Sequence, residues 1–205
     1  MNTSKNNVAL VTGASDGIGA EFVEILAGRG YDLILVARRE EKLNELAVRL
    51  SDEFGVECTV MAADLSEPKA AQNLFQRIEE RGLQVNFLIN NAGLLHNGFF
   101  ANLSLEAQEK MIQVNVIALT ALTHLYAAKM SSNGGGHILN VASLAGWMAI
   151  PNQNVYAASK AYVVSFSQAL SNEMIAANSG VHVTALCLCN KKKKMMDNPD
   201  QGATL

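Results

Sequence analysis

Short apolar runs rich in β-branched residues alternate with longer amphipathic stretches along most of this chain, and this alternation constrains its fold most strongly. The apolar runs have no polar side to face water, so each predicted strand is expected to be covered on both faces, as in a parallel sheet. Strands that alternate with helices through right-handed crossovers form a doubly wound α/β domain. The sequence therefore predicts a single α/β domain, with a parallel sheet and helices on both of its faces.

The predicted elements follow one another without an internal repeat or an interdomain linker. Strands are expected at 8–12, 32–37, 57–62, 86–90, 137–141 and 181–188. Helices are expected at 17–29, 40–54, 67–81 (with Pro68 in its first turn), 105–130 (as one or two helices) and 155–177. This order divides the chain into a polar tail at 1–7, one domain at 8–188 and a lysine-rich tail at 189–205.

Composition excludes several classes of protein. The chain has 205 residues, 49% of them hydrophobic, which suits one domain with a sizeable core, and its net charge of -3 argues against nucleic acid as a partner. The amino end lacks the apolar segment of a signal peptide, and no uninterrupted apolar run approaches the roughly 20 residues of a membrane helix. We therefore expect a cytoplasmic protein without a membrane partner. Cys58, Cys187 and Cys189 lack metal-ligand spacing, so they are expected to be reduced, buried thiols, and no metal site is predicted.

A glycine-rich loop follows the first predicted strand and opens the first predicted helix. It reads T-G-A-S-D-G-I-G from Thr12 to Gly19, a G-x-x-x-G-x-G spacing. Glycines at such a turn permit positive φ and let the backbone approach a pyrophosphate at the helix amino terminus. A tight strand-to-helix turn without a ligand is the alternative, but the position in an alternating fold favours a Rossmann-like dinucleotide site. The candidate cofactor contacts in the loop are Gly13, Ser15, Asp16, Gly17, Ile18 and Gly19.

Two arginines, Arg38 and Arg39, follow the second predicted strand, and no acidic residue precedes Glu40. Folds that bind NAD often place an acidic residue here for the ribose hydroxyls, whereas arginine suits a 2′-phosphate. The pattern therefore favours NADP(H) over NAD(H), with Ser15 as a further hydroxyl donor. The alternative is that both arginines are solvated charges at the start of a helix.

Tyr156 and Lys160 lie four residues apart on a predicted helix and therefore share one face, with Cβ atoms about 5–6 Å apart. An ammonium group there favours the phenolate and is expected to lower the tyrosine pKa from about 10. Ser143, thirteen residues upstream, could hold a carbonyl oxygen while the tyrosine moves a proton. The same spacing occurs on ordinary helices, so this interpretation depends on a hydride donor supplied elsewhere in the chain.

Over about residues 8–187 the ordered set of motifs resembles the short-chain dehydrogenase/reductase family. The motifs are T-G-A-S-D-G-I-G at 12–19, Asp64-Leu65 after the third strand, N-N-A-G at 90–93, Asn115 in Q-V-N-V, Ser143 in N-V-A-S, and Y-A-A-S-K at 156–160. The resemblance implies reversible hydride transfer between NADP(H) and a small-molecule carbonyl or alcohol. It also implies a homo-oligomer, a dimer or tetramer, assembled through the long helices near 105–130 and 155–177.

The resemblance assigns cofactor contacts beyond the glycine loop. Asp64 would bind the adenine amino group and Leu65 would contribute its backbone. Asn91, Ala92 and Gly93 would line the adenosine and ribose side of the site. The alternative for Asp64 is a turn residue that only caps the next helix.

The resemblance also assigns the catalytic roles. Asn115 would hold a helix kink and a water molecule in a proton relay, and Ser143 would orient the substrate oxygen. Tyr156 would be the general acid or base, while Lys160 would bind the nicotinamide ribose and lower the tyrosine pKa. Each residue also has a purely structural alternative. Asn115 could merely cap or kink a helix, and Ser143 could form hydrogen bonds with backbone groups at the end of a strand.

The loops expected to contact substrate, at 94–100 and 144–154, lie beyond the carboxyl ends of the strands, near the switch point between strands one and four. They are mostly apolar and contain Phe99, Phe100, Trp147, Met148 and Ile150. This favours an apolar ketone, aldehyde or alcohol as substrate; packing beneath the loops is the alternative. His96 is interpreted as an incidental polar residue.

The carboxyl end departs from the family pattern. Family members carry Pro-Gly and then a threonine after the sixth strand, which leads into a loop that covers the substrate. Here Leu188, Cys189 and Asn190 are followed by Lys191–Lys194. Three explanations are possible. The chain could be a truncated or frame-shifted product, it could have a missing or misregistered segment, or it could be a variant that a partner completes. A missing lid leaves a rival function open, an NADP-binding regulatory or structural protein without useful turnover.

Overall fold

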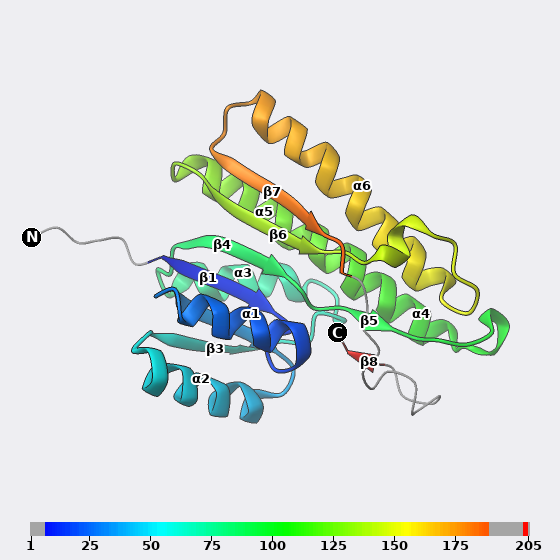
Figure 1. The fold of residues 1–205 in the computed structure, drawn as a ribbon, viewed down its shortest axis with the longest axis horizontal. Helices are drawn as coiled ribbons and strands as arrows, with labels where there is room; N and C mark the ends of the chain where they lie inside the picture. Colours follow the sequence, from blue (N-terminus) through cyan, green and yellow to red (C-terminus); the bar gives the residue numbers. More distant parts are fainter. Residues whose placement is uncertain (1–6, 189–202, 205) are drawn as a thin grey trace, which may run out of the picture.

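A six-stranded parallel sheet forms the centre of the protein in the computed structural model, which describes residues 7–188 and 203–204 (Figure 1). The strand order is β3-β2-β1-β4-β6-β7, and every neighbouring pair is parallel. The strands are β1 (Val8–Thr12), β2 (Asp32–Ala37), β3 (Cys58–Ala62), β4 (Val85–Asn90), β6 (Gly136–Val141) and β7 (Val181–Leu186). The predicted doubly wound α/β fold is confirmed, with its switch point between β1 and β4.

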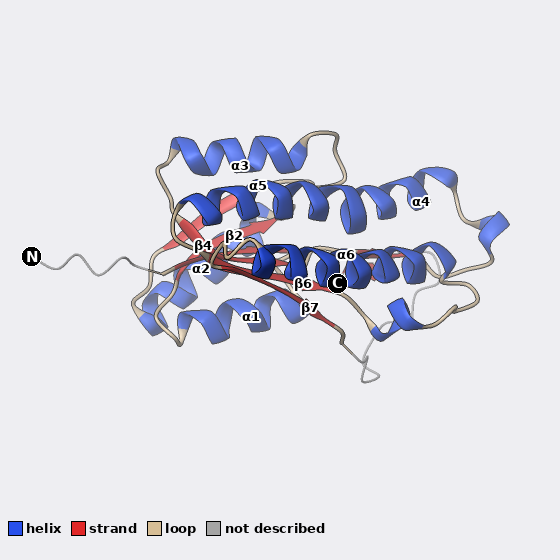
Figure 2. Ribbon diagram, turned by 90° about the horizontal axis from the view of Figure 1, so that it is seen from above, coloured by secondary structure: helices blue, strands red, loops and turns tan. Residues whose placement is uncertain are grey.

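Helices cover both faces of the sheet (Figure 2). One layer contains α1 (Gly17–Ala27) and α2 (Glu40–Phe54). The other contains α3 (Ala70–Glu80), α4 (Leu105–Ile112), α5 (Leu119–Ser132) and α6 (Asn154–Ala176). This arrangement leaves the loops that follow the strands free to build a site at one edge of the sheet.

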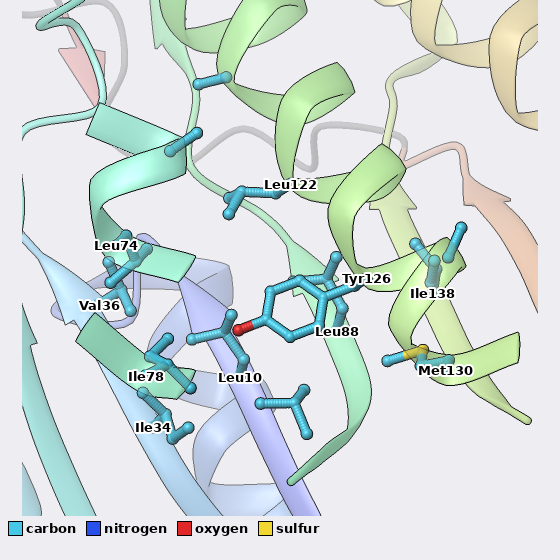
Figure 3. Close-up of a cluster of buried hydrophobic side chains, with 14 of the residues drawn as sticks. Leu10, Ile34, Val36, Leu74, Ile78, Leu88, Leu122, Tyr126, Met130 and Ile138 are labelled. Atoms are coloured by element: carbon cyan, nitrogen blue, oxygen red, sulfur yellow. The ribbon is translucent and has the colours of Figure 1, made fainter. Parts of the chain in front are cut away.

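Alternating side chains of each central strand enter the two layers. On β1, Leu10 packs against the α3 and α5 layer, whereas Ala9 and Val11 pack against α1 and α2. Figure 3 shows the first of these cores, in which Tyr126 of α5 lies among leucine and isoleucine side chains. Because both faces are buried, the strands are apolar at nearly every position, which is the pattern that predicted a parallel sheet.

The third helix begins later than its sequence predicts. Residues 67–69 form a turn, and α3 starts at Ala70. Asp64 Oδ1 accepts hydrogen bonds from the Ser66 amide at 2.9 Å and the Ser66 hydroxyl at 2.7 Å, which closes a turn. Lys69 then adopts a φ of 61°, a left-handed conformation that no helix continues through. Pro68 therefore lies in this turn and not in the helix.

The helical region predicted at 105–130 is continuous but irregular. Between α4 and α5 the residues Gln113–Ala118 form a π-helical segment, η2, which contains Asn115. Such segments insert extra backbone into a helix and are frequent at functional sites. A further feature absent from the predictions is the antiparallel pair of β5 (Leu94–Leu95) and β8 (Ala203–Thr204). The lysine run Lys191–Lys194 lies outside the described residues.

The stretch Leu105–Ser132 is long and apolar enough, by length and composition, to cross a membrane. It is interrupted by polar side chains, among them Gln113 and Asn115, so it is not an uninterrupted apolar run. Half of its most apolar window is buried inside the fold, and core helices meet the same criterion, so this finding is weak support for a membrane span. Among the described cysteines, Cys58 and Cys187 are half-buried free thiols, and the described residues contain no cluster of metal-ligating side chains.

Candidate active site

The predicted site residues converge because the strands that carry them are parallel. The glycine loop follows β1, Arg38 and Arg39 follow β2, Asp64 follows β3, and Asn91 follows β4. The carboxyl ends of parallel strands lie at one edge of the sheet, so these segments meet there (Figure 1). A cavity at this edge is lined by nine of the candidate cofactor residues, namely Gly13, Ser15, Asp16, Arg38, Arg39, Asp64, Leu65, Ala92 and Gly93.

The glycine loop is built on close backbone approaches. A Cβ at Gly19 would lie 2.0 Å from the Gly13 carbonyl oxygen, which no side chain tolerates. Gly13 has a φ of 68°, and a Cβ there would lie 2.8 Å from Asn91 Nδ2. Gly17 has a φ of 54° but open space around its missing Cβ. Gly19 and Gly13 are therefore required by space, and Gly17 by backbone conformation alone.

The loop is clamped to the end of β4 by hydrogen bonds. Thr12 Oγ1 accepts from the amides of Asn91 and Ala92, both at 3.0 Å, and donates to the Ile89 carbonyl at 3.3 Å. Asn91 Nδ2 donates to the carbonyls of Thr12 at 3.0 Å and Gly13 at 3.3 Å. Asn91 is buried behind the loop, so it shapes the cavity wall without lining it.

A cluster of charges lies at the mouth of the cavity. Arg39 and Lys42 both form ion pairs with Asp16, the latter at 3.3 Å, and Arg39 also donates to Ser15 Oγ at 3.2 Å. These side chains are about half exposed, so solvent screens the pairs and each contributes little to stability. The cluster nevertheless places Arg39 beside Ser15, and both residues line the cavity together with Arg38.

The tyrosine, lysine and serine lie together at the next part of this edge. Tyr156 and Lys160 belong to α6 and are 5% and 2% exposed, and Lys160 Nζ lies 5.8 Å from the centre of the tyrosine ring. Lys160 Nζ donates to the Val141 carbonyl at 2.7 Å. Ser143 caps the 3-10 turn η3 (Leu144–Trp147), and its hydroxyl accepts from the Ala145 amide at 3.2 Å.

Burial is the largest influence on the pKa values of Tyr156 and Lys160. It raises the pKa of Tyr156 above its usual value, while a hydrogen bond from Ser143 opposes the rise. It lowers the pKa of Lys160 to about 8. The expected lowering of the tyrosine pKa by the lysine is therefore not seen in the protein alone. The physical reason is that Lys160 is itself desolvated and donates to a backbone carbonyl, while it faces the tyrosine ring.

Gly93 joins the cavity to this trio. It lines the cavity, and a Cβ built on it would lie 3.6 Å from Lys160 Nζ and 3.4 Å from Asn115 Oδ1. Gly93 therefore lies between the lining of the cavity and the side chains of Lys160 and Asn115. The two parts of the predicted site are thus adjacent at Gly93.

Asn115 holds the backbone of β5 and the helix of the tyrosine in place. Its Oδ1 accepts from the Leu94 amide at 2.8 Å, and its Nδ2 donates to the Leu94 carbonyl at 2.9 Å and to Ser159 Oγ at 3.0 Å. Ser159 in turn donates to the Tyr156 carbonyl at 2.7 Å. Both amide hydrogens of Asn115 are therefore used in hydrogen bonds to Leu94 and Ser159.

The two candidate substrate loops are tied to each other. The Gly98 amide donates to the Asn152 carbonyl at 2.9 Å. Phe99, Phe100, Trp147 and Met148 are exposed on these loops, whereas Ile150 packs against the small cluster that contains Tyr156. The two loops are therefore apolar, and one of their five predicted side chains packs against the cluster that contains Tyr156. His96 is partly buried in the first loop.

Sequence reasoning missed three residues that shape this site. Thr12 was visible only as the first letter of the glycine motif, and Ser159 as a letter within Y-A-A-S-K. Gly146 gave no signal at all, yet its missing Cβ would lie 2.7 Å from the Lys160 carbonyl oxygen. Its absent side chain lets η3, and with it Ser143, lie against α6.

A glycine-lined cavity at the switch point of a doubly wound sheet, with a buried tyrosine and lysine beside Gly93, is typical of a nucleotide-binding oxidoreductase. The family model described as short chain dehydrogenase matches residues 7–202. The chain therefore belongs to the short-chain dehydrogenase family.

Individual relatives agree with this membership. The chain is 34% identical over 200 residues to an uncharacterized oxidoreductase of Staphylococcus saprophyticus, with 98% of this chain and 82% of that protein covered. It is 36% identical to the very-long-chain 3-oxoacyl-CoA reductase of Phaeosphaeria nodorum, with 94% of this chain but only 60% of that protein covered. Several curated relatives are thus considerably longer than this chain.

A solved structure shows the same fold. It is a short-chain dehydrogenase from Sphingobium yanoikuyae in complex with NADPH, 39% identical, with a TM-score of 0.83. The match covers 88% of this chain and 70% of that one.

Proposed function

We propose that this chain is an NADP(H)-dependent oxidoreductase that interconverts an apolar ketone or aldehyde and its alcohol, with Tyr156 as general acid or base. The observation that carries the proposal is the adjacency of the two parts of the site. The cavity formed by the glycine loop and the arginines ends at Gly93, next to Lys160, and Lys160 shares a helix face with Tyr156.

The residues fit the cofactor. Gly13 and Gly19 let the loop fold tightly on itself and against Asn91, and the amino terminus of α1 points its amide groups at the loop. Arg38 and Arg39 would hold the 2′-phosphate, and Asp64 with Leu65 would hold the adenine. The NADPH complex of the Sphingobium protein supports the choice of NADP(H) over NAD(H).

When bound, NADPH supplies a hydride to the carbonyl carbon. Ser143 would hold the carbonyl oxygen, and Tyr156 would donate its phenolic proton to that oxygen as the charge develops there. Oxidation of the alcohol reverses both transfers, and Tyr156 then accepts the proton. Lys160 would bind the nicotinamide ribose, and its ammonium would stabilise the phenolate left behind. Asn115 would position Leu94 and, through Ser159, the Tyr156 turn.

An apolar substrate is supported by the loops at the rim. Phe99, Phe100, Trp147 and Met148 are exposed beside the trio, and the two loops carry no Lys or Arg side chain to bind a substrate carboxylate. Exposed apolar patches of this kind mark ligand or protein contacts.

Turnover and cofactor binding are tested separately. NADPH oxidation is measured across a panel of ketones and aldehydes, and NADPH binding by the quenching of Trp147 fluorescence and by calorimetry. We expect turnover of apolar ketones that Tyr156→Phe abolishes while it leaves the NADPH dissociation constant within about twofold. Binding of NADPH without turnover of any substrate would favour the rival function, a nucleotide-binding protein of the same fold.

Arg38→Ala tests the cofactor preference. We expect it to weaken NADPH binding by tenfold or more, since a charge-assisted contact contributes about 1.5–3 kcal/mol, and to change NADH binding little. Equal losses for the two cofactors would remove Arg38 from the phosphate site.

A further inference from the structure

A buried hydrogen-bonded network joins four elements next to the trio and has no direct part in the proposed chemistry. Its centre is Asn140 of β6. Asn140 Oδ1 accepts from Asn90 Nδ2 of β4 at 2.9 Å and from Thr123 Oγ1 of α5 at 3.3 Å. Its Nδ2 donates to Ser167 Oγ of α6 at 3.0 Å. None of these four side chains is more than 3% exposed.

The bond between Asn140 and Ser167 connects the two segments that carry the trio. Asn140 precedes Ser143 by three residues on the same strand and its extension. Ser167 follows Lys160 by seven residues on α6, about two helical turns, so both side chains lie on the same face of the helix. The bond therefore fixes the strand of Ser143 against the helix of Tyr156 and Lys160.

A second bond lies beside it. Lys160 Nζ donates to the carbonyl of Val141, the residue that follows Asn140. Two attachments from one helix face to adjacent residues of one strand define both the position of α6 along β6 and its rotation. With the Ser167 attachment lost, α6 keeps the Lys160 bond to β6 and the bonds of Ser159 and Tyr162 to the neighbouring helix. It then has one fixed point fewer on the strand that leads to Ser143, and the apolar packing that remains specifies a register less sharply.

The chemistry of the network favours a positioning role over a purely stabilising one. A buried amide is costly unless it is paired, and replacing a pair by apolar groups of similar shape is often nearly neutral for stability. Asn90 Oδ1 lies buried without a partner among the described residues, so the network carries a cost in stability. What directional hydrogen bonds supply is a single arrangement of the packed elements.

We propose that Asn140 and Ser167 are positioning residues, whose hydrogen bond sets the register of α6 on β6 and thereby places Tyr156 and Lys160 relative to Ser143. The inference rests on the proposed function of this site. In this proposal the network determines the relative position of β6 and α6, whereas a cluster that only fills the core would not.

Ser167→Ala tests the proposal, with Thr123→Val as the matched control. Both variants remove one buried hydroxyl from the same network, but Thr123 lies on α5, which carries none of the trio. The first readout is the titration of the Lys160 ε-carbon by NMR in the protein without substrate, and the second is kcat with NADPH and a ketone. Ser167→Thr, which keeps the hydroxyl, serves as the conservative variant.

We expect Ser167→Ala to raise the pKa of Lys160 by about half a unit or more, because a loosened α6 admits water to the ammonium. We expect kcat to fall about tenfold with little change in the KM for NADPH, since small misplacements of reacting groups are costly. Thr123→Val should leave both quantities near the wild-type values, and Ser167→Thr should restore them.

Equal effects of Ser167→Ala and Thr123→Val on the Lys160 pKa would overturn the proposal, as would an unchanged Lys160 pKa in Ser167→Ala. The NMR readout needs no turnover, so a wild-type protein that reduces nothing would refute the proposed function while the titration still decides the role of Ser167.

Discussion

Lys160 shows at the scale of one residue how the site opposes stability. The side chain is 2% exposed, and burial holds its pKa near 8. Between about pH 8 and its ordinary pKa of 10.5, the unfolded chain binds more protons at this position than the folded protein does. The folded state therefore carries its full penalty below pH 8, and stability rises with pH through this window.

Lys160→Met should remove that penalty. The shift from 10.5 to about 8 corresponds to roughly 3 kcal/mol, less whatever the bond to Val141 contributes. We expect the variant to raise the free energy of unfolding at pH 7 and to flatten its dependence on pH between 8 and 10, measured by urea denaturation. A variant less stable than the wild type at pH 7 would contradict the direction of the pKa shift.

Gly19→Ala and Gly17→Ala separate space from backbone conformation in the glycine loop. Ala at position 19 meets the Gly13 carbonyl, so the loop must move, and we expect NADPH binding to weaken at least tenfold. Ala at position 17 has room but a φ of 54°, which costs about 1 kcal/mol, or about 2–4 °C in Tm. Calorimetry measures NADPH binding by the two variants, and thermal unfolding measures their Tm. Similar NADPH binding by both variants would contradict the requirement for space at position 19.

At the scale of elements, the 3-10 turn η3 and α6 form one unit. Gly146 lets the turn approach the backbone of α6 at Lys160, and Ser143 begins that turn. Trp147, at the other end of η3, donates to Cys187 Sγ beyond β7 at 3.4 Å. The position of the Ser143 hydroxyl thus depends on how closely η3 lies on α6.

Gly146→Ala should therefore impair turnover more than stability alone explains. A Cβ would lie 2.7 Å from a backbone oxygen that cannot rotate away, so η3 must shift by several tenths of an ångström. We expect kcat to fall at least tenfold at temperatures where the variant is folded. Gly28→Ala, in ordinary contact at 3.5 Å at the end of α1, is the control and should keep kcat.

Sequence patterns predicted the helices and strands better than they predicted the contacts between side chains. The strands 8–12 and 32–37 and the helix 40–54 match the structure, because two-sided burial and amphipathic spacing leave strong local signals. The start of α3 at Ala70 was missed because the Asp64 turn and the positive φ of Lys69 depend on side-chain hydrogen bonds and on a rare conformation. The sequence motifs identified Ser143, Tyr156 and Lys160 as candidates. The raised pKa of Tyr156 follows from burial, which no motif encodes.

At the scale of the whole molecule, an apolar surface on α5 and α6 is available for self-association. Ile117 of η2 is 50% exposed, and it lines a groove with Thr120, His124 and Tyr162. Thr120 and Tyr162 hydroxyls are hydrogen-bonded at 2.9 Å, which fixes the two helices side by side. This surface corresponds to the helices through which a homo-oligomer is expected.

Ile117→Glu should abolish that oligomer. A charge at the centre of an apolar interface is costly to bury, so we expect the variant to elute as a monomer in light-scattering chromatography. Ile25→Glu, on α1 at the opposite face of the sheet and 52% exposed, should leave the oligomer intact. A wild-type monomer at micromolar concentration would contradict the expected assembly.

The hydroxyl of Thr12 connects the glycine loop to the segment after β4, so ligand binding at one of them should affect the other. Two successive amides of the β4 extension depend on it, and the Asn91 side chain returns two bonds to the loop. The glycine loop and the segment that follows β4 are therefore linked directly by hydrogen bonds, and we expect them to open together. Hydrogen exchange at the amides of Asn91 and Ala92 should slow in step when either end of the site is filled, so one pair of protons reports on the whole crevice.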